Sequence, residues 1–142
     1  MSAPTRLFEI PHHQLQHHPQ DNMFVSKIDG KWIGVSTKDL LDAAMQVYRA
    51  LIAKGIQPGD RVGIVSSTRY EWNVMDIAIQ QVGAIVVPFY PNISVNDYRY
   101  IFNDAGIKLC VVGDDDLYQK INGIKSEIPT LQELYTMDVV PN

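Results

Sequence analysis

The chain has few cysteines, no excess of positive charge and no long hydrophobic run, and each shortage excludes a class of protein. Its single cysteine, Cys110, cannot form an internal disulfide, which argues against a disulfide-stabilised secreted domain. The net charge of −4 leaves no basic surface for nucleic acid or anionic lipid. No apolar stretch approaches the roughly 20 residues that span a bilayer, and the N-terminus lacks an apolar signal core. We therefore expect a soluble, cytoplasmic domain.

The composition is that of an ordinary globular protein. The chain has 142 residues, about one domain's worth, with 46% hydrophobic and 20% charged residues. Residues 1–21 contain three prolines and are expected to form an irregular N-terminal arm. Residues 22–142 are expected to form a partial α/β subdomain.

That subdomain is expected to open with a β-hairpin and a helix. Two short strands flank Asp29-Gly30, a strong two-residue turn signal. Ser36 or Thr37 can cap a following helix, whose apolar residues recur at helical spacing until Gly55.

Helix, glycine and apolar strand then alternate three times, which predicts an α/β fold with a parallel βαβαβ sheet and flanking helices. Pro88 should end the ladder of the second strand. After Gly123 the periodicity fades, and we expect the sheet to stop after three strands, as if interrupted at the C-terminus. The expected strands read RVGIV, AIVVPFY and IKLCVV.

The stretch Ser66-Ser67-Thr68 lies between an expected strand and a helix, where phosphate-binding loops occur. Such loops need glycines for close backbone approach and often a lysine. This loop has no glycine after Gly63 and no lysine, and Arg69 is the only cation near it. We favour a simple helix cap, with Trp72 packing beneath it.

Two other loops follow expected strands, at the sheet edge where ligands bind in parallel folds. Asp114-Asp115-Asp116 could hold a ribose or Mg²⁺, although a carboxylate cap on the next helix is the favoured interpretation. In Pro88–Ser94, Tyr90 could line a pocket; we favour a proline-stiffened connection to a cap at Ser94.

Four histidines lie together in "HHQLQHH", and on a helix two of them would lie one turn apart and could chelate a divalent metal. We favour solvated histidines with adventitious nickel or zinc binding. No serine–histidine–aspartate or cysteine–histidine set can be argued, because Cys110 lies mid-strand. We therefore predict no catalytic, cofactor-binding or metal-binding residue in this chain. The four histidines of the stretch HHQLQHH are His12, His13, His17 and His18.

Three motifs of the chain form a recognisable series: a Gly-x-x-x-Gly-Asp-Arg-Val turn (Gly55–Val62), the segment TRYEW and the strand GAIVVPFYP. In these motifs, and from about residue 4 to 138, the chain resembles the N-terminal part of long-chain fatty acid–CoA ligases, which are adenylate-forming enzymes. Thr68 stands where the family usually has asparagine, and Tyr70 where it has proline. Both departures concern the helix start.

The resemblance implies an enzyme that converts fatty acid, ATP and coenzyme A, with Mg²⁺, to acyl-CoA, AMP and pyrophosphate through an acyl-adenylate. The family's phosphate loop, adenine pocket and magnesium ligands would lie beyond Asn142. The chain alone is thus expected to be inactive and to bind none of these cofactors. A homodimer and peripheral membrane association are compatible with the resemblance.

Two alternatives remain open. The chain could be a stand-alone binding or oligomerisation module on the same scaffold, or a small nucleotide binder that uses Ser66–Thr68 and the Asp114 cluster. Absence of an ATP- or AMP-dependent rise in melting temperature would argue against the latter.

Overall fold

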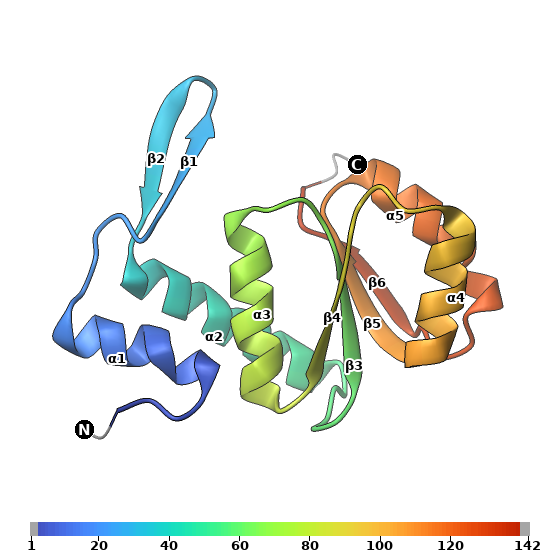
Figure 1. Cartoon of the computed structure of the whole chain (residues 1–142), viewed down its shortest axis with the longest axis horizontal. Coiled ribbons are helices and arrows are strands. Elements are labelled where there is room, and N and C mark those ends of the chain that lie inside the picture. The colour runs from blue at the N-terminus through green and yellow to red at the C-terminus, as the bar shows by residue number, and fades with distance from the viewer. Residues whose placement is uncertain (1–2, 140–142) are drawn as a thin grey trace. The chain divides into compact units, whose positions relative to one another are not determined.

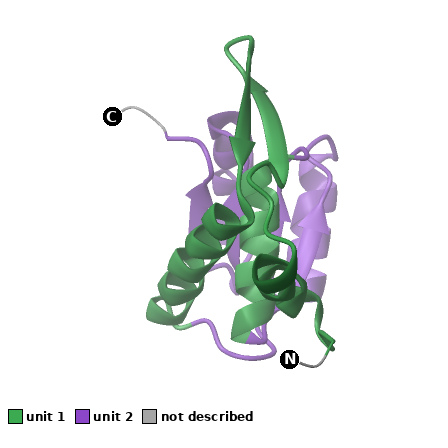
Figure 2. Ribbon diagram, turned by 90° about the vertical axis from the view of Figure 1, so that its left-hand side faces the viewer, with its two compact units in different colours: residues 1–55, 69–82 green, residues 56–68, 83–142 purple. Residues whose placement is uncertain are grey.

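The computed structural model describes residues 3–139, which form two compact units (Figure 2). The first unit comprises the described chain as far as Gly55 together with Arg69–Val82. The second comprises Ile56–Thr68 and the chain from Gly83 onward. The helix Tyr70–Val82 thus belongs with the N-terminal half, although it follows a strand of the second unit in sequence.

The first unit contains the hairpin and most of the helices, shown in blue to green in Figure 1. Residues 1–21 were expected to be irregular, and this prediction was wrong for Leu7–His17. A 3₁₀ turn leads there directly into an α-helix, with Pro11 in its first turn, where a missing N–H costs no hydrogen bond. The elements of this unit are η1 (Leu7–Glu9), α1 (Ile10–His17), β1 (Phe24–Ile28), β2 (Lys31–Val35), α2 (Thr37–Ala53) and α3 (Tyr70–Val82).

The hairpin prediction is confirmed. Strands β1 and β2 pair antiparallel from Phe24 opposite Val35 to Ile28 opposite Lys31. Asp29 and Gly30 have φ values of 49° and 79°, the positive values that a type I′ turn requires at both central positions. The hairpin's apolar side chains are largely exposed; Trp32 has 70% of its surface accessible.

The helices α2 and α3 supply the core of the first unit. Ser36 caps α2 in a capping box with Asp39, as the sequence predicted. Buried residues of the two helices pack together, and the Tyr70 hydroxyl donates to the backbone oxygen of Asp39 over 3.3 Å. This core consists of Leu40, Ala44, Val74 and Ile77, with Phe8, Met23 and Phe24 packed against it.

The second unit is a four-stranded parallel sheet in the order β4-β3-β5-β6. Helices α4 and α5 contribute to the same core as the strands, and Figure 1 shows them beside the sheet in yellow to orange. The predicted α/β class and parallel arrangement are confirmed. The elements are β3 (Arg61–Val65), β4 (Ile85–Phe89), α4 (Val95–Ala105), β5 (Ile107–Val112), α5 (Asp115–Asn122), η2 (Lys125–Glu127) and β6 (Glu133–Thr136).

The fourth strand corrects the prediction of a sheet with three strands. Strand β6 pairs with β5 from Leu109 opposite Glu133 to Val112 opposite Thr136. It has only four residues, and Leu134 is the only one of them that is buried. Such a short, mixed segment has no continuous apolar run. Pairing with β5 makes it a strand, and its own sequence pattern does not predict one.

The expectation that Pro88 ends its ladder was also wrong. Strand β4 continues through Pro88 to Phe89, which pairs with Val65. Among the described residues β4 is an edge strand. A proline has no backbone N–H to donate, and on the open side of an edge strand no neighbouring strand requires one.

Aromatic side chains fill the centre of the second unit's core. The ring centroids of Phe89 and Phe102 lie 4.7 Å apart, and the rings of Tyr98 and Phe102 meet edge to face. Gly106 ends α4 in the left-handed conformation, with φ of 63°. Within residues 3–139, no helix combines the length and apolar character needed to cross a membrane.

Candidate functional site

The candidate site is the edge of the second unit's sheet where the parallel strands end. Strands β3, β4 and β5 end at Val65, Phe89 and Val112, and each leads into one of the loops that the sequence singled out. Ligands of parallel α/β folds bind at this edge. The hydrogen bonds of the three loops decide what each can bind.

The first loop, Ser66–Thr68, packs directly against the loop that follows β5. The backbone N–H of Gly113 donates to the carbonyl oxygen of Val65 over 2.9 Å. A Cβ added at Gly113 would lie 2.8 Å from the Ser66 hydroxyl oxygen, so a glycine is needed for this close approach. The two loops therefore brace one another.

The same loop does not fit the phosphates of a nucleotide. Ser66 is buried, and its hydroxyl donates to the carbonyl oxygen of Ser67 over 2.9 Å. The nearest cation in the sequence, Arg69, binds Glu71 through two hydrogen bonds of 2.8 and 3.0 Å. The Arg69 guanidinium lowers the pKa of the Glu71 carboxyl, as expected for a tight ion pair. The phosphate-binding alternative has no support here.

The second loop, Gly113–Asp116, begins a helix. The Asp114 carboxylate accepts a hydrogen bond from the backbone N–H of Leu117 over 2.9 Å, as an N-cap does. Asp115 accepts a hydrogen bond from the side chain of Gln119 over 3.2 Å. The favoured interpretation of these acids as a cap is confirmed.

The third loop, which follows β4, holds Tyr90 away from the core. The Tyr90 side chain is 78% exposed, and its backbone carbonyl accepts the hydroxyl of Tyr98 over 2.7 Å. Ser94 then caps α4 in a capping box with Asp97, as predicted. Tyr90 therefore lies in a connection between β4 and α4, as the favoured interpretation had it, with its side chain exposed.

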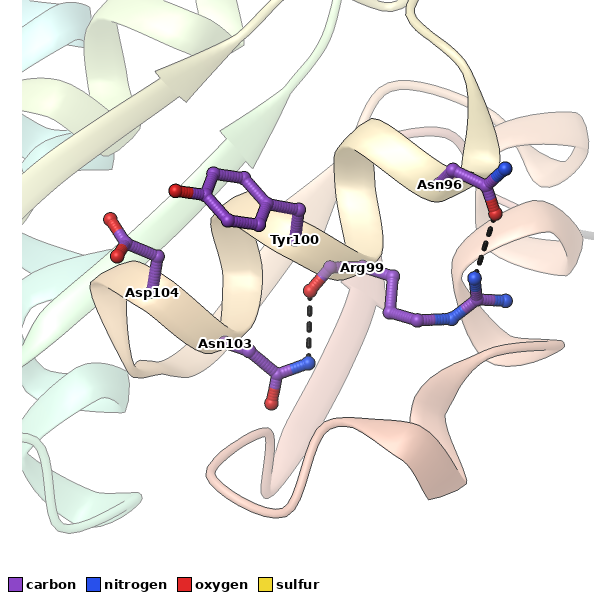
Figure 3. A pocket seen from close by; sticks show the side chains of 5 residues that line it. All are labelled: Asn96, Arg99, Tyr100, Asn103 and Asp104. Carbon is purple, nitrogen blue, oxygen red and sulfur yellow. Dashed lines mark hydrogen bonds between the residues drawn. The ribbon is translucent and has the colours of Figure 1, made fainter.

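A shallow hollow on one side of α4 is a feature of the described residues that the sequence analysis missed (Figure 3). The residues that line it are spaced 3 and 4 positions apart, so they share one face of the helix. This spacing is the signal in the sequence that could have identified the hollow. The Arg99 guanidinium donates to the side-chain oxygen of Asn96 over 2.7 Å and forms an ion pair with Glu127 over 2.7 Å. The positive charge in the hollow is therefore already bonded within the fold. The hollow is lined by Asn96, Arg99, Tyr100, Asn103 and Asp104.

Nucleophilic and metal chemistry have no complete site in the described chain. Complete burial raises the pKa of the Cys110 thiol, which keeps it protonated and unreactive. Among residues 3–139, no three or more histidine, cysteine, aspartate or glutamate side chains are grouped to hold a metal ion. His13 and His17 stack on α1, whereas His12 meets Gln81 with 3.2 Å between the side-chain nitrogens.

Comparisons with known proteins identify the scaffold. The family model described as AMP-binding enzyme matches residues 11–141. Over 107 residues the chain is 34% identical to the long-chain-fatty-acid–CoA ligase FadD15 of Mycobacterium tuberculosis, covering 75% of this chain and 18% of the relative. The chain thus spans less than a fifth of that relative's length.

Solved structures agree with the fold. The coronafacic acid ligase of Pectobacterium brasiliense superimposes with a TM-score of 0.80 at 20% identity, over 94% of this chain and 25% of that one. The N-terminal domain of FACL13 from Mycobacterium tuberculosis gives 0.69 at 21% identity, over 75% and 28% of the two chains. With its family match extending over nearly all described residues, the chain belongs to the family of AMP-binding enzymes.

Proposed function

We propose that this chain is the N-terminal part of the large domain of an ATP-dependent long-chain fatty acid–CoA ligase. The parent enzyme would convert a fatty acid, ATP and coenzyme A to acyl-CoA, AMP and pyrophosphate, with Mg²⁺ as the metal. The observation that carries the proposal is the 34% identity to a long-chain-fatty-acid–CoA ligase over three quarters of the chain.

In this proposal the described residues are scaffold. Support for this role comes from Ser66, Asp114 and Tyr98, which all make hydrogen bonds within the fold. We therefore place the catalytic, cofactor-binding and metal-binding residues of the parent enzyme outside this chain. The chain alone would not catalyse acyl-adenylate formation and would bind no cofactor.

The cellular setting is proposed by the same analogy. We propose a cytoplasmic enzyme whose partner is a fatty acid and not a nucleic acid. Homodimerisation through the N-terminal arm and peripheral contact with membranes are further proposals. Gel filtration and flotation with phospholipid vesicles test these two separately.

The decisive experiment compares the 142-residue chain with the product of its whole reading frame. We expect the frame to continue beyond codon 142, and the encoded protein to form acyl-CoA from palmitate, ATP, Mg²⁺ and coenzyme A. The isolated chain should show neither palmitate-dependent pyrophosphate exchange nor an ATP-dependent rise in Tm. A stop codon after Asn142 would contradict the proposal and favour a stand-alone module. Turnover by the isolated chain would contradict the scaffold role.

A further inference from the structure

Two histidines of α1, which the sequence would place one turn apart on a helix, are in contact in the structure. His13 and His17 lie one turn apart, and their rings stack with centroids 4.1 Å apart and 20° between the planes. The Nδ1 atom of His17 lies 2.8 Å from the backbone oxygen of His13. His12, His17 and His18 are exposed, as expected from the sequence, and the structure adds the contact between the His13 and His17 rings.

The contact with the backbone oxygen determines the tautomer of His17. A carbonyl oxygen only accepts, so Nδ1 of His17 carries the proton and donates it, which leaves the lone pair on Nε2. Histidines that bind metals commonly donate their other ring N–H to a carbonyl or carboxylate in this way. His17 is exposed, so its Nε2 is accessible to an ion from solvent.

We propose that His13 and His17 form a two-histidine site for a late first-row divalent cation: Cu²⁺, Ni²⁺ or Zn²⁺. Imidazole nitrogen suits these ions, and side chains at i and i+4 of a helix lie on one face, within reach of a single ion. The lone pairs of the stacked rings do not converge on one point, so binding of one ion by both requires the His13 ring to rotate out of the stack. Copper should bind most tightly, as the order of divalent-metal affinities requires.

The remaining coordination positions would be filled by water. Within the described residues, no third histidine, cysteine, aspartate or glutamate completes a metal-binding group here. A closed structural zinc site takes four protein ligands, so this pair makes an open and exchangeable site. The inference concerns only this chain's own residues and is independent of the proposed ligase function.

Metal binding would stabilise α1. This helix has eight residues, a length at which an isolated helix is not stable in water. An ion held by both histidines spans one turn and binds only the folded helix. Binding to the folded state alone shifts the unfolding equilibrium by mass action.

The test is thermal unfolding of the full 142-residue chain with Cu²⁺ or Zn²⁺ alone, together with electron paramagnetic resonance of the bound Cu²⁺. We expect a metal-dependent rise in Tm that a chelator reverses, and a spectrum with two nitrogen ligands. His13→Gln and His17→Gln should each lose the rise and one nitrogen ligand. His18→Gln is the matched control, since it removes an adjacent histidine outside the stacked pair.

Three results would overturn the proposal. The first is no metal-dependent change in the unaltered chain. The second is a rise in Tm that persists in the His13→Gln/His17→Gln double variant. The third is a His18→Gln variant that loses binding as completely as His17→Gln, which would place the ion on the adjacent histidines.

Discussion

The hydroxyl of Tyr98 donates a hydrogen bond to the backbone carbonyl oxygen of Tyr90 over 2.7 Å. Tyr98 lies on α4 and is completely buried, whereas Tyr90 lies in the loop that follows β4 and exposes its ring. The bond therefore connects the core of the second unit to the loop at its strand ends. Both a mutation and a change of pH can test its contribution.

Replacing Tyr98 with phenylalanine keeps the ring and removes the hydroxyl. The Tyr90 carbonyl would lose its partner, so we expect the free energy of unfolding to fall by about 1–2 kcal/mol. Urea denaturation followed by circular dichroism measures this change. Tyr100→Phe is the control, because Tyr100 is 71% exposed and its change should stay within about 0.5 kcal/mol. Equal effects of both variants would contradict a role for the buried bond.

The same tyrosine should make stability depend on alkaline pH. Burial, with smaller effects of Cys110 and Asp114, raises the pKa of Tyr98 from 10.0 to about 12. The folded state thus favours the neutral phenol, and its contribution is complete below pH 10 and is lost as pH rises towards 12. Unfolding measured from pH 8 to 12 should show a weaker decline in Tyr98→Phe than in the unaltered chain.

A half-buried ion pair should contribute to stability at neutral pH. Lys108 donates to the Asp60 carboxylate over 2.7 Å, and the backbone N–H of Gln57 donates to the same oxygen over 2.9 Å. Both bonds lower the pKa of Asp60, that with Lys108 more strongly. Their contribution is present above the ordinary pKa of aspartate and is lost as pH falls through the lowered value.

We therefore expect Asp60→Asn to lower the free energy of unfolding at pH 7 by about 1 kcal/mol and to weaken its loss in acid. Denaturation curves between pH 2 and 7 test both expectations. Asp42→Asn disrupts the exposed pair of Lys38 and Asp42 and should change stability by less than about 0.5 kcal/mol. An unchanged acid profile in Asp60→Asn would show that the pair contributes nothing.

Two glycines in the same backbone conformation should differ in their tolerance of alanine. Gly55 and Gly106 have φ values of 76° and 63°, so alanine at either costs about 1–2 kcal/mol for the left-handed conformation. At Gly55 a new Cβ meets open space, whereas at Gly106 it would lie 2.8 Å from Nη2 of Arg61. Arg61 is held there by a 2.7 Å hydrogen bond to the carbonyl oxygen of Ala105.

Gly106→Ala should therefore destabilise the protein more than Gly55→Ala, and the difference in Tm includes the cost of the contact with Arg61. A double-mutant cycle of Gly106→Ala, Arg61→Ala and the double variant checks the cause, because Gly106→Ala should cost less stability in the Arg61→Ala background. Equal melting temperatures for the two single variants would show that the arginine moves aside at no cost.

The sequence by itself determined the local structure of this protein wherever the signal was local. Asp29-Gly30 requires a turn with positive φ, Ser36 and Ser94 cap their helices, and the run RVGIV is too apolar and too short for anything but a buried strand. The long resemblance along the chain likewise indicated the family that the comparisons then showed. These features depend on residues close together in the chain.

Only the three-dimensional structure decided the rest, because those features depend either on partners far away in the sequence or on side-chain conformations that a sequence pattern does not specify. Strand β6 exists because β5 offers it hydrogen bonds, and Pro88 is tolerated because β4 lies at an edge. The Ser66 loop looked like a phosphate site until its hydroxyl proved to be bonded within the loop. The pairing of His13 with His17 needed a helix where three prolines had indicated none, and Pro11 fits that helix because it lies in the first turn.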